Sequence, residues 1–296
     1  MKRAVSALRA AIAVISAAIA CAFGAHAQQQ SLPVVGYLSF TSPDERPTLV
    51  AAFRQGLQQA GFVVGQNVAI EYRSAGGKFE RLPALAAELA KIPAAVIAAT
   101  GGEAVARAAK AATSQIPIVF TTSSDVVKGG LVASLNRPGG NVTGVSLLGY
   151  ELDAKRLQLL RELLPRASTI GVLVDANNPA IAATLPQIKA AADANGLRLV
   201  VLDARTEVEI DATFASLQYK GVDGLLVATN PFYEGRRDDI VALAKRHSVP
   251  VMYPWREYSV AAPYKLRPNT SWRSISKPLG LTVPNTLIGR ADEVIE

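Results

Sequence analysis

The sequence predicts an α/β protein with two Rossmann-like, doubly wound lobes, each built on a parallel β-sheet covered by helices. Two observations lead to this prediction. Short runs of β-branched residues alternate with Ala- and Leu-rich segments along most of the 296 residues, a pattern typical of parallel strands buried on both faces. A Gly-, Asn- and Pro-rich segment at residues 136–149 interrupts the series, which then starts again. Two successive series favour two lobes.

The first lobe is expected over residues 33–143 as an alternation of strands and helices. Its first strand is predicted at residues 33–40. A helix is predicted at residues 46–60, because apolar side chains such as Val50 and Phe53 recur there at helical spacing. The other strands of this lobe are expected at residues 67–74, 94–100 and 116–122, and the other helices at 79–91, 101–113 and 123–135.

The second lobe is expected over residues 144–258. A helix at residues 151–164 precedes its first strand at residues 169–175. The same alternation of β-branched and Ala-rich segments then continues. The later strands are expected at residues 197–203, 222–229 and 249–254, and the later helices at 180–196, 207–221 and 232–247.

The first 27 residues have the features of a secretory signal peptide. Lys2 and Arg3 precede an apolar run, and Ala25-His26-Ala27 has the small-x-small pattern of a cleavage site. We therefore predict cleavage after Ala27 and an exported product with no stable membrane insertion. A membrane anchor is one alternative, but the apolar run is shorter than the roughly 20 residues that a span needs. Lipidation at Cys21 is another alternative.

Cysteine and histidine are scarce. The only cysteine is Cys21 and one of the two histidines is His26, so the chain after residue 27 keeps no thiol and a single imidazole, His247. This excludes a disulfide framework, thiolate catalysis and a metal site of several Cys or His. A hydrolytic triad would have to use His247, which falls at a predicted helix end, where an imidazole complements the helix dipole.

The remaining composition argues against other classes. Cleavage removes three basic residues, which lowers the formal charge from +7 to +4, and the other basic residues are scattered among acids. We expect no nucleic-acid partner. No G-x-G-x-x-G segment follows the first strand and no P-loop is present. A nucleotide-dependent enzyme is therefore disfavoured, and we expect no metal and no cofactor.

Ligands of open parallel sheets bind beyond the carboxyl ends of the strands. The loops that follow the predicted strands are rich in hydroxyls, amides and free N–H groups at helix starts, which suit a small carboxylate. Such residues are equally typical of helix caps. The loops lie at residues 39–45, 100–103 and 121–125 in the first lobe, and at 175–179, 229–232 and 253–258 in the second.

Several segments resemble a known family. They are AAFRQGL, RLPALAAEL, IPIVFTTSSD, LNRPGGNVTG, YPWREY and the ending LGLTVPNTLIGRADEVIE. In these segments the chain is similar to periplasmic substrate-binding proteins of ABC transporters, in the branch of tryptophan- and tyrosine-type uptake proteins. The resemblance covers residues 33–258 and 279–296, and residues 135–144 are its most specific part.

The resemblance implies a type I periplasmic-binding fold, in which two lobes joined by a hinge close on a solute and deliver it to an inner-membrane permease. An amino acid or related carboxylate is the implied solute. The strand-end loops give the implied ligand-binding residues, which are Ser39, Thr41, Thr100, Gly101, Thr122, Asp125, Asn177, Asn178, Asn230 and Tyr253. One departure from the family is Asp125-Val126, where Asp-Pro is common.

Four aromatic residues are candidates for an apolar wall of such a site: Tyr37, Phe40, Phe232 and Trp255. For Tyr37 and Phe232, core packing is the preferred alternative. Two other functions share the visible features of the sequence. One is a ligand-sensing module that docks on a membrane receptor, and the other is an inactive gene product.

The end of the chain departs from the family pattern. Relatives usually continue past YPWREY with a Gly-rich strand, a long helix and a return strand, whereas residues 263–278 break the alternation. Codons can be chosen for residues 265–278 that, read with a two-base shift, encode APTKHELAINLKA, which is similar to that return strand. We hypothesise that residues 259–296 form an aberrant tail, with residues 263–278 out of frame and C-terminal strands and a helix missing. A genuine local loop is the alternative.

Overall fold

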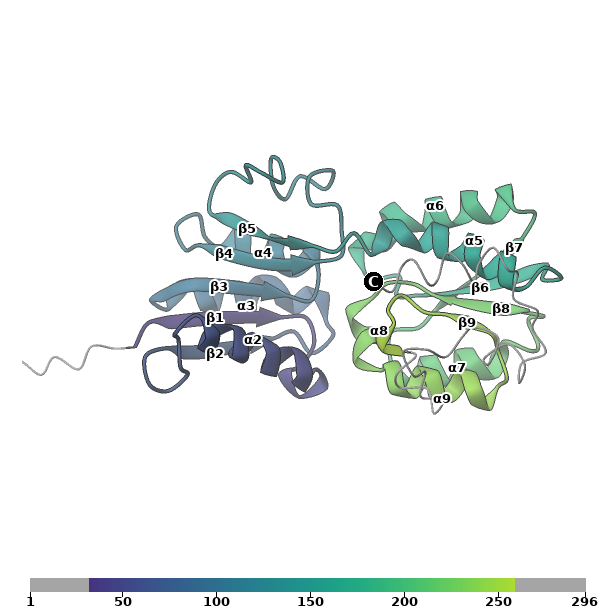
Figure 1. The fold of residues 1–296 in the computed structure, drawn as a ribbon, viewed down its shortest axis with the longest axis horizontal. Helices are drawn as coiled ribbons and strands as arrows, with labels where there is room; N and C mark the ends of the chain where they lie inside the picture. Colours follow the sequence, from purple (N-terminus) through teal and green to yellow (C-terminus); the bar gives the residue numbers. More distant parts are fainter. Residues whose placement is uncertain (1–31, 259–296) are drawn as a thin grey trace, which may run out of the picture.

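The computed structural model describes residues 32–258, which form two α/β lobes lying side by side (Figure 1). The predicted class of two parallel-sheet lobes is confirmed. The predicted signal peptide at residues 1–27 lies outside the described residues, as does the tail at residues 259–296.

The first lobe contains a five-stranded parallel sheet in the order β2-β1-β3-β4-β5. Strand β1 lies between β2 and β3, and its residues from Val35 onward are buried because they are small or apolar and face covered sides of the sheet. The strands are β1 (Val34–Ser39), β2 (Ala69–Ser74), β3 (Ala94–Thr100), β4 (Ile118–Thr122) and β5 (Val142–Ser146).

Three α-helices flank this sheet, and two of them cover the same face. Helices α3 (Leu82–Lys91) and α4 (Glu103–Ala112) pack on β1 to β4 through side chains such as Leu89 and Val105. Helix α2 (Pro47–Gln59) lies over the other face, where Phe53 contacts Tyr37 of β1 at a ring-centroid distance of 5.0 Å. Short 3-10 turns precede two of the helices: η1 (Pro43–Glu45) and η2 (Phe79–Arg81).

The helix predicted at residues 123–135 is not present, which corrects the sequence prediction. The chain turns there instead, and Gly130 has a φ of 72°, which a helix does not allow. The Asp125 carboxylate accepts hydrogen bonds from the N–H groups of Val127 and Lys128, at 3.1 and 3.0 Å. A carboxylate and two consecutive glycines thus replace helical hydrogen bonds with a turn.

The second lobe contains a four-stranded parallel sheet in the order β7-β6-β8-β9. All six residues of β6 are buried, as are the four of β8, because helices cover both faces. The strands are β6 (Thr169–Val174), β7 (Arg198–Asp203), β8 (Gly224–Val227) and β9 (Val251–Met252).

Helices α5 and α6 pack on one face of this sheet, and α7 and α9 on the other (Figure 1). The helices are α5 (Asp153–Leu163), α6 (Pro179–Ala194), α7 (Glu207–Ser216), α8 (Pro231–Gly235) and α9 (Arg237–Arg246), with the 3-10 turn η3 at Tyr150–Leu152. His247 is the C-cap residue of α9, at the helix end predicted from the sequence. Across residues 32–258, no helix combines the length and apolar character needed to span a membrane.

In the described part of the chain, one connection links the lobes. It follows β5, which pairs with β4 in the first sheet, so the division expected at residues 143 and 144 falls inside a strand. The crossover is Leu147–Gly149. Leu148 has a φ of 50°, a left-handed conformation that is uncommon for Leu and marks a sharp change in chain direction.

Candidate functional site

A cavity of about 480 Å³ lies between the two lobes. The first lobe contributes the carboxyl ends of β1, β3 and β4 together with η1 and α2. The second lobe contributes α8, Tyr150, Arg237 and residues 255, 257 and 258. The site therefore lies beyond the carboxyl ends of the first sheet's strands, where ligands of open parallel sheets bind.

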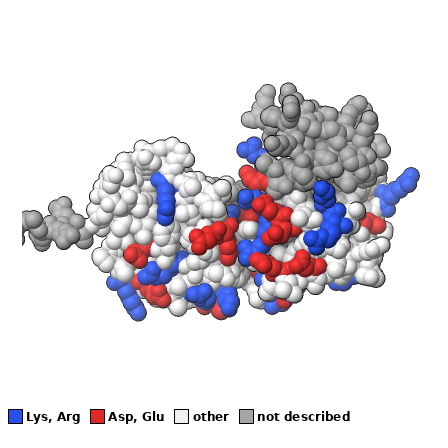
Figure 2. Space-filling view, turned by 90° about the horizontal axis from the view of Figure 1, so that it is seen from below, with Lys and Arg blue, Asp and Glu red and all other residues white. Residues whose placement is uncertain are grey.

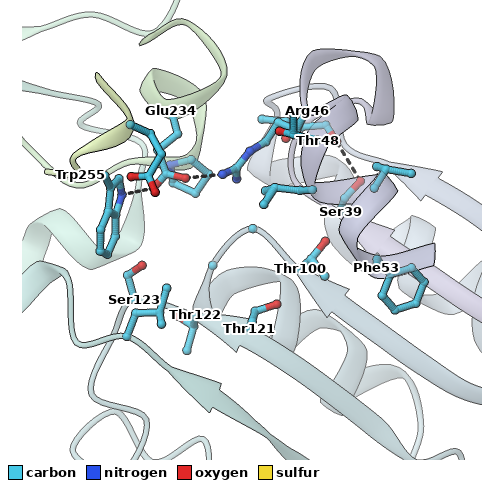
Figure 3. Close-up of a pocket in the computed structure, with 18 of the residues that line it drawn as sticks. Ser39, Arg46, Thr48, Phe53, Thr100, Thr121, Thr122, Ser123, Glu234 and Trp255 are labelled. Atoms are coloured by element: carbon cyan, nitrogen blue, oxygen red, sulfur yellow. Dashed lines mark hydrogen bonds and ion pairs between the residues drawn. The ribbon is translucent and has the colours of Figure 1, made fainter. Parts of the chain in front are cut away.

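One side of the cavity carries hydroxyl groups from the first lobe. They lie at or just after the ends of neighbouring strands, and they are Ser39, Thr100, Thr121, Thr122 and Ser123. Arg46 and Glu234 lie across the cavity from them (Figure 3). The Ser39 hydroxyl donates to the Thr41 carbonyl at 2.8 Å, and Thr122 Oγ1 accepts from the Ser124 N–H at 3.2 Å. These internal bonds fix two of the hydroxyls in place.

Two glycines shape the same wall. Gly101 has a φ of 93°, and a Cβ there would lie 3.1 Å from the Phe40 Cβ. Gly102, with a φ of 117°, is the N-cap residue of α4. The glycines let the backbone pass close to Phe40 and bring the first N–H groups of α4 toward the cavity, where helix termini favour negative groups.

The opposite wall contains an ion pair between the lobes. The Arg46 guanidinium, from the start of α2, contacts Glu234 Oε2 of α8, and both side chains are largely buried. Glu234 Oε1 accepts a hydrogen bond from the Trp255 indole at 2.8 Å. Figure 3 shows these three side chains in one row. One carboxylate thus joins a cation of the first lobe to an aromatic ring of the second.

The Trp255 ring is held by two further contacts. The Arg156 guanidinium lies over its ring face, 5.8 Å from the centroid. At Gly149, in the crossover between the lobes, an added Cβ would lie only 2.9 Å from a ring carbon of Trp255. The ring therefore packs against the connection between the lobes, and only glycine leaves it room.

A buried polar cluster lies behind this ring. Asp153 is fully buried and pairs with Arg156, and it also accepts from the Thr229 N–H at 3.1 Å. Arg156 and Thr229 both donate to the Gly149 carbonyl, at 3.0 and 3.2 Å. Burial raises the pKa of Asp153 to about 6, although Arg156 and Thr229 oppose the shift. The cluster ties α5 and the end of β8 to the crossover.

An apolar side of the cavity is formed by Tyr37, Leu49, Val50 and Phe53. Tyr37 comes from β1 and the other three from α2, where Phe53 packs against the sheet and Leu49 is exposed. Together with Trp255, they offer ring and aliphatic surface opposite the polar groups. The arrangement suits a small molecule with a polar head and an apolar side chain.

Half of the residues predicted for the site line the cavity. These are Ser39, Thr41, Thr100, Gly101 and Thr122. Of the four aromatic candidates, Tyr37 and Trp255 line it, whereas Phe40 and Phe232 lie in the main hydrophobic cluster.

The other five predicted residues lie outside the cavity lining. Asp125 stabilises the turn after β4, and Asn178 and Asn230 accept hydrogen bonds as N-caps of α6 and α8. Asn177 is exposed, and Tyr253 stacks on Tyr258 with centroids 4.9 Å apart. Asn178 and Asn230 are therefore helix-capping residues, which is the alternative role that the sequence offers for them.

Sequence reasoning did not select Arg46, Glu234, Phe53 or Thr121 as ligand-contacting residues. The signal for Thr121 was available, because it lies in a loop already identified at a strand end. Arg46 and Glu234 are 188 positions apart in the sequence. Arg46 caps the start of α2 and Glu234 lies in α8, so their pairing depends on how the two lobes meet. Within residues 32–258, no group of three or more His, Cys, Asp or Glu side chains is placed to hold a metal ion.

Two parallel-sheet lobes that enclose a cavity with polar and aromatic walls are the architecture of a two-lobe solute-binding protein. The chain belongs to the ABC transporter substrate binding protein family, whose model matches residues 34–261. The resemblance found in the sequence is confirmed.

Among characterised proteins, the chain is similar to a tyrosine-binding protein of Clostridioides difficile strain R20291, with 29% identity over 211 residues. This match covers 70% of the chain and 60% of the relative, so the chain spans less than two thirds of the relative's length.

Two solved structures share the fold. One is a conserved domain protein of Vibrio cholerae, with a TM-score of 0.69 and 20% identity over 88% of this chain and 98% of that one. The other is the ABC domain from Streptococcus pneumonia in complex with L-Trp, with a TM-score of 0.66 and 18% identity over the same shares of the two chains. At these identities the comparison concerns the fold.

Proposed function

We propose that the protein binds an amino acid with an aromatic side chain in the cavity between its lobes and delivers it to an ABC permease for import. The observation that carries the proposal is the combination of a hydroxyl-lined wall with the Arg46–Glu234 pair and the Trp255 ring in one cavity. A relative described as tyrosine-binding and a fold neighbour solved with L-Trp support the same class of solute.

The charges around the cavity fit a zwitterion. The charged side chains in its described lining are Arg46, Arg237, Glu234 and Glu257, two of each sign. A dicarboxylate or a phosphate would favour an excess of bases, and a polyamine an excess of acids. A balanced lining, with hydroxyls and the N–H groups of α4 nearby, suits a solute with one carboxylate and one ammonium group.

The cavity's size and rings support an aromatic side chain. Its volume of about 480 Å³ falls in the lower part of the range of roughly 300–1,000 Å³ that small-molecule sites occupy. The Trp255 ring is fixed at its N–H edge by Glu234 and on one face by Arg156. A fixed ring surface favours stacking by another ring. For import, we propose an extracytoplasmic location, consistent with the signal-like sequence of residues 1–27.

The proposal is tested by calorimetric titration of the purified full chain with L-Tyr, L-Trp, L-Phe and L-Leu. Tyramine, which lacks the carboxylate, and 3-(4-hydroxyphenyl)propionate, which lacks the ammonium group, serve as ligand controls. We expect at least one aromatic amino acid to bind, with both controls weaker by about tenfold or more. Binding of L-Leu more tightly than every aromatic amino acid, or of tyramine as tightly as L-Tyr, would contradict the proposal.

A pair of matched variants locates the binding site. Thr121→Val removes a hydroxyl from the cavity wall, whereas Thr143→Val makes the same change on β5, outside the lining. We expect Thr121→Val alone to weaken binding of the best ligand, by about threefold to tenfold. Equal effects of the two substitutions would place the ligand elsewhere.

A further inference from the structure

Helix α8 makes several of the contacts between the lobes that lie away from their covalent connection. In the second lobe, Asn230 caps α8, and the Tyr233 hydroxyl donates to the Ala204 carbonyl at 2.7 Å. Both side chains are fully buried. Helix α8 is therefore fixed to its own lobe and presents a rigid edge to the other one.

That edge approaches three loops of the first lobe. A Cβ at Gly102 would lie 3.7 Å from Pro231, and one at Gly77 would lie 3.9 Å from Phe232. A Cβ at Gly235 would lie 3.9 Å from a Glu45 carboxylate oxygen. A methyl group at any of these three glycines would therefore be in van der Waals contact with the other lobe, so the lobes approach closely along α8.

Two ion pairs also join the lobes along the same edge. Consecutive residues of the first lobe, Glu45 and Arg46, face Arg236 and Glu234 of the second. Arg46 pairs with Glu234, and Arg236 lies 3.5 Å from Glu45. Each lobe thus supplies one acid and one base. Figure 2 shows acidic and basic side chains gathered where the lobes meet.

The two ion pairs have different positions relative to the cavity. Arg46 and Glu234 line it, whereas Glu45 and Arg236 do not. Arg236 also lies 2.6 Å from Glu207 of its own lobe, so that Glu45 and Glu207 share one guanidinium. The outer pair therefore acts on the approach of the lobes without forming part of the wall that a ligand touches.

We propose that these four residues form a reciprocal charge clamp, in which Glu45 and Arg236 are positioning residues that hold the lobes together and thereby set the affinity for solute. The inner pair has a second consequence, because Glu234 also orients the Trp255 ring. Closure of the lobes and placement of the aromatic wall are coupled through one carboxylate. The inference rests on the proposed function, because the clamp would close the cavity in which the solute is proposed to bind.

The test measures lobe separation directly and without added solute. The chain's only cysteine is Cys21, so a Cys21→Ala chain accepts spin labels at Ala52→Cys on α2 and Ala212→Cys on α7, both exposed positions. Distance distributions are compared for this chain, for Glu45→Gln and for Glu88→Gln. The last variant is the matched control, because Glu88 pairs with Arg73 inside the first lobe, at 2.8 Å.

We expect Glu45→Gln to shift the distribution toward longer distances, and Glu88→Gln to leave it unchanged. The dissociation constant for the best amino acid should rise by about twofold to fivefold in Glu45→Gln, the range for one partly exposed ion pair. The preference between aromatic and aliphatic amino acids should not change, because Glu45 does not line the cavity. Raising the salt concentration should reproduce the shift in the parent chain.

A charge exchange separates the two roles of Glu234. In Arg46→Glu combined with Glu234→Arg, the inter-lobe attraction is restored but Trp255 loses its acceptor. With Trp272→Phe in the background, Trp255 is the only tryptophan and its fluorescence reports its surroundings. We expect the double exchange to recover the short distances between the spin labels that Arg46→Glu alone loses. Its Trp255 emission should still differ from that of the parent chain.

The clamp is refuted if Glu45→Gln and the parent chain have the same distance distribution while binding is measurable. It is also refuted if Glu88→Gln opens the lobes as much as Glu45→Gln does. Failure of the proposed function would look different. No amino acid would then bind, yet the Glu45→Gln chain would still show longer distances, and the clamp would stand.

Discussion

The central strands of the second lobe and the outer strands of the first differ in how they are covered. Every residue of β6 is buried, whereas β4 alternates between buried and exposed positions and three of the five residues of β5 are exposed. The exposed fractions of Val119 and Val145 are 46% and 55%. In the second lobe, helices lie on both faces of the sheet. In the first, α2 covers only the end of the outer face that contains β1 and β2.

This difference shows that an apolar strand does not by itself imply a covered strand. Val119 and Val145 have the β-branched side chains that predict a buried sheet, yet the element expected beside them, at residues 123–135, is a turn. The outer face of β4 and β5 is consequently bare among the described residues. Predictions of stability can test how far the two sheets differ.

The largest expected effect contrasts one core residue with one residue of the bare face. Leu226 of β8 is fully buried between the sheet and helices α5 and α6. Leu226→Ala should lower the free energy of unfolding by about 3 kcal/mol, through lost burial and the resulting cavity. Val145→Ala should lower it by less than about 0.5 kcal/mol. Urea unfolding followed by circular dichroism measures both, and similar values for the two would remove the contrast.

The next effect concerns the crossover between the sheets. Gly149→Ala would place a methyl group 2.9 Å from a ring carbon of Trp255 and 3.1 Å from Ser123, so we expect a loss of about 2 kcal/mol. Gly56→Ala is the matched control, since it lies inside α2 with nothing near its Cβ position, and it should stabilise by up to about 1 kcal/mol. Thermal unfolding compares them. If Gly149→Ala left the free energy of unfolding unchanged, the Trp255 ring would be free to move away from the added methyl group.

A smaller effect depends on pH and tests the buried cluster behind Trp255. The pKa of Asp153 is raised from 3.8 to about 6 by burial, so its ionised form is less favourable in the folded state than in the unfolded state. As pH falls from 6.5 to 4.5, the folded chain takes up a proton that the unfolded chain does not. This adds stability, of the order of 1–2 kcal/mol, that is lost again as pH rises through 6.

The check is the difference in unfolding free energy between the parent chain and Asp153→Asn, measured from pH 4.5 to 6.5. Groups that titrate elsewhere, including Asp175 and Asp203, contribute equally to both chains. The parent should gain stability relative to the variant as the pH is lowered. A difference that stays constant with pH would assign Asp153 an ordinary pKa.

The contrast between the sheets also explains which features the sequence predicts. Residues 170–174 and 224–227 are apolar throughout, and both segments lie in buried strands. Residues 142–146 fall in the segment predicted to separate the two series, because Gly144 and the neighbouring Pro-Gly-Gly run obscure a strand. The helix predicted after β4 fails for a local reason, since Gly129 and Gly130 permit the turn that Asp125 stabilises.

At the candidate site, the predictable part follows from topology. Ser39, Thr100 and Thr122 end neighbouring parallel strands, so their meeting at one edge of the sheet could be predicted. Asn178 and Asn230 match the same pattern, but their side chains are used as helix caps. The Arg46–Glu234 pair was beyond sequence reasoning, because charged residues at helix starts usually face solvent and nothing local indicates a partner in the other lobe.

The smallest expected effect decides what the bare face of the first sheet means. Val119→Thr and Val145→Thr replace two apolar side chains by near-isosteric polar ones at exposed positions, and together they should change the free energy of unfolding by less than about 0.5 kcal/mol. The same change at Val172, which is fully buried in β6, should cost about 1–3 kcal/mol, because a hydroxyl is buried without a designed partner. If the double substitution on the first sheet is nearly as costly as Val172→Thr, another part of the chain or another molecule covers that face in solution, and the two sheets are alike after all. A neutral result would instead mean that β4 and β5 tolerate in solvent an apolar surface of the kind that β6 buries.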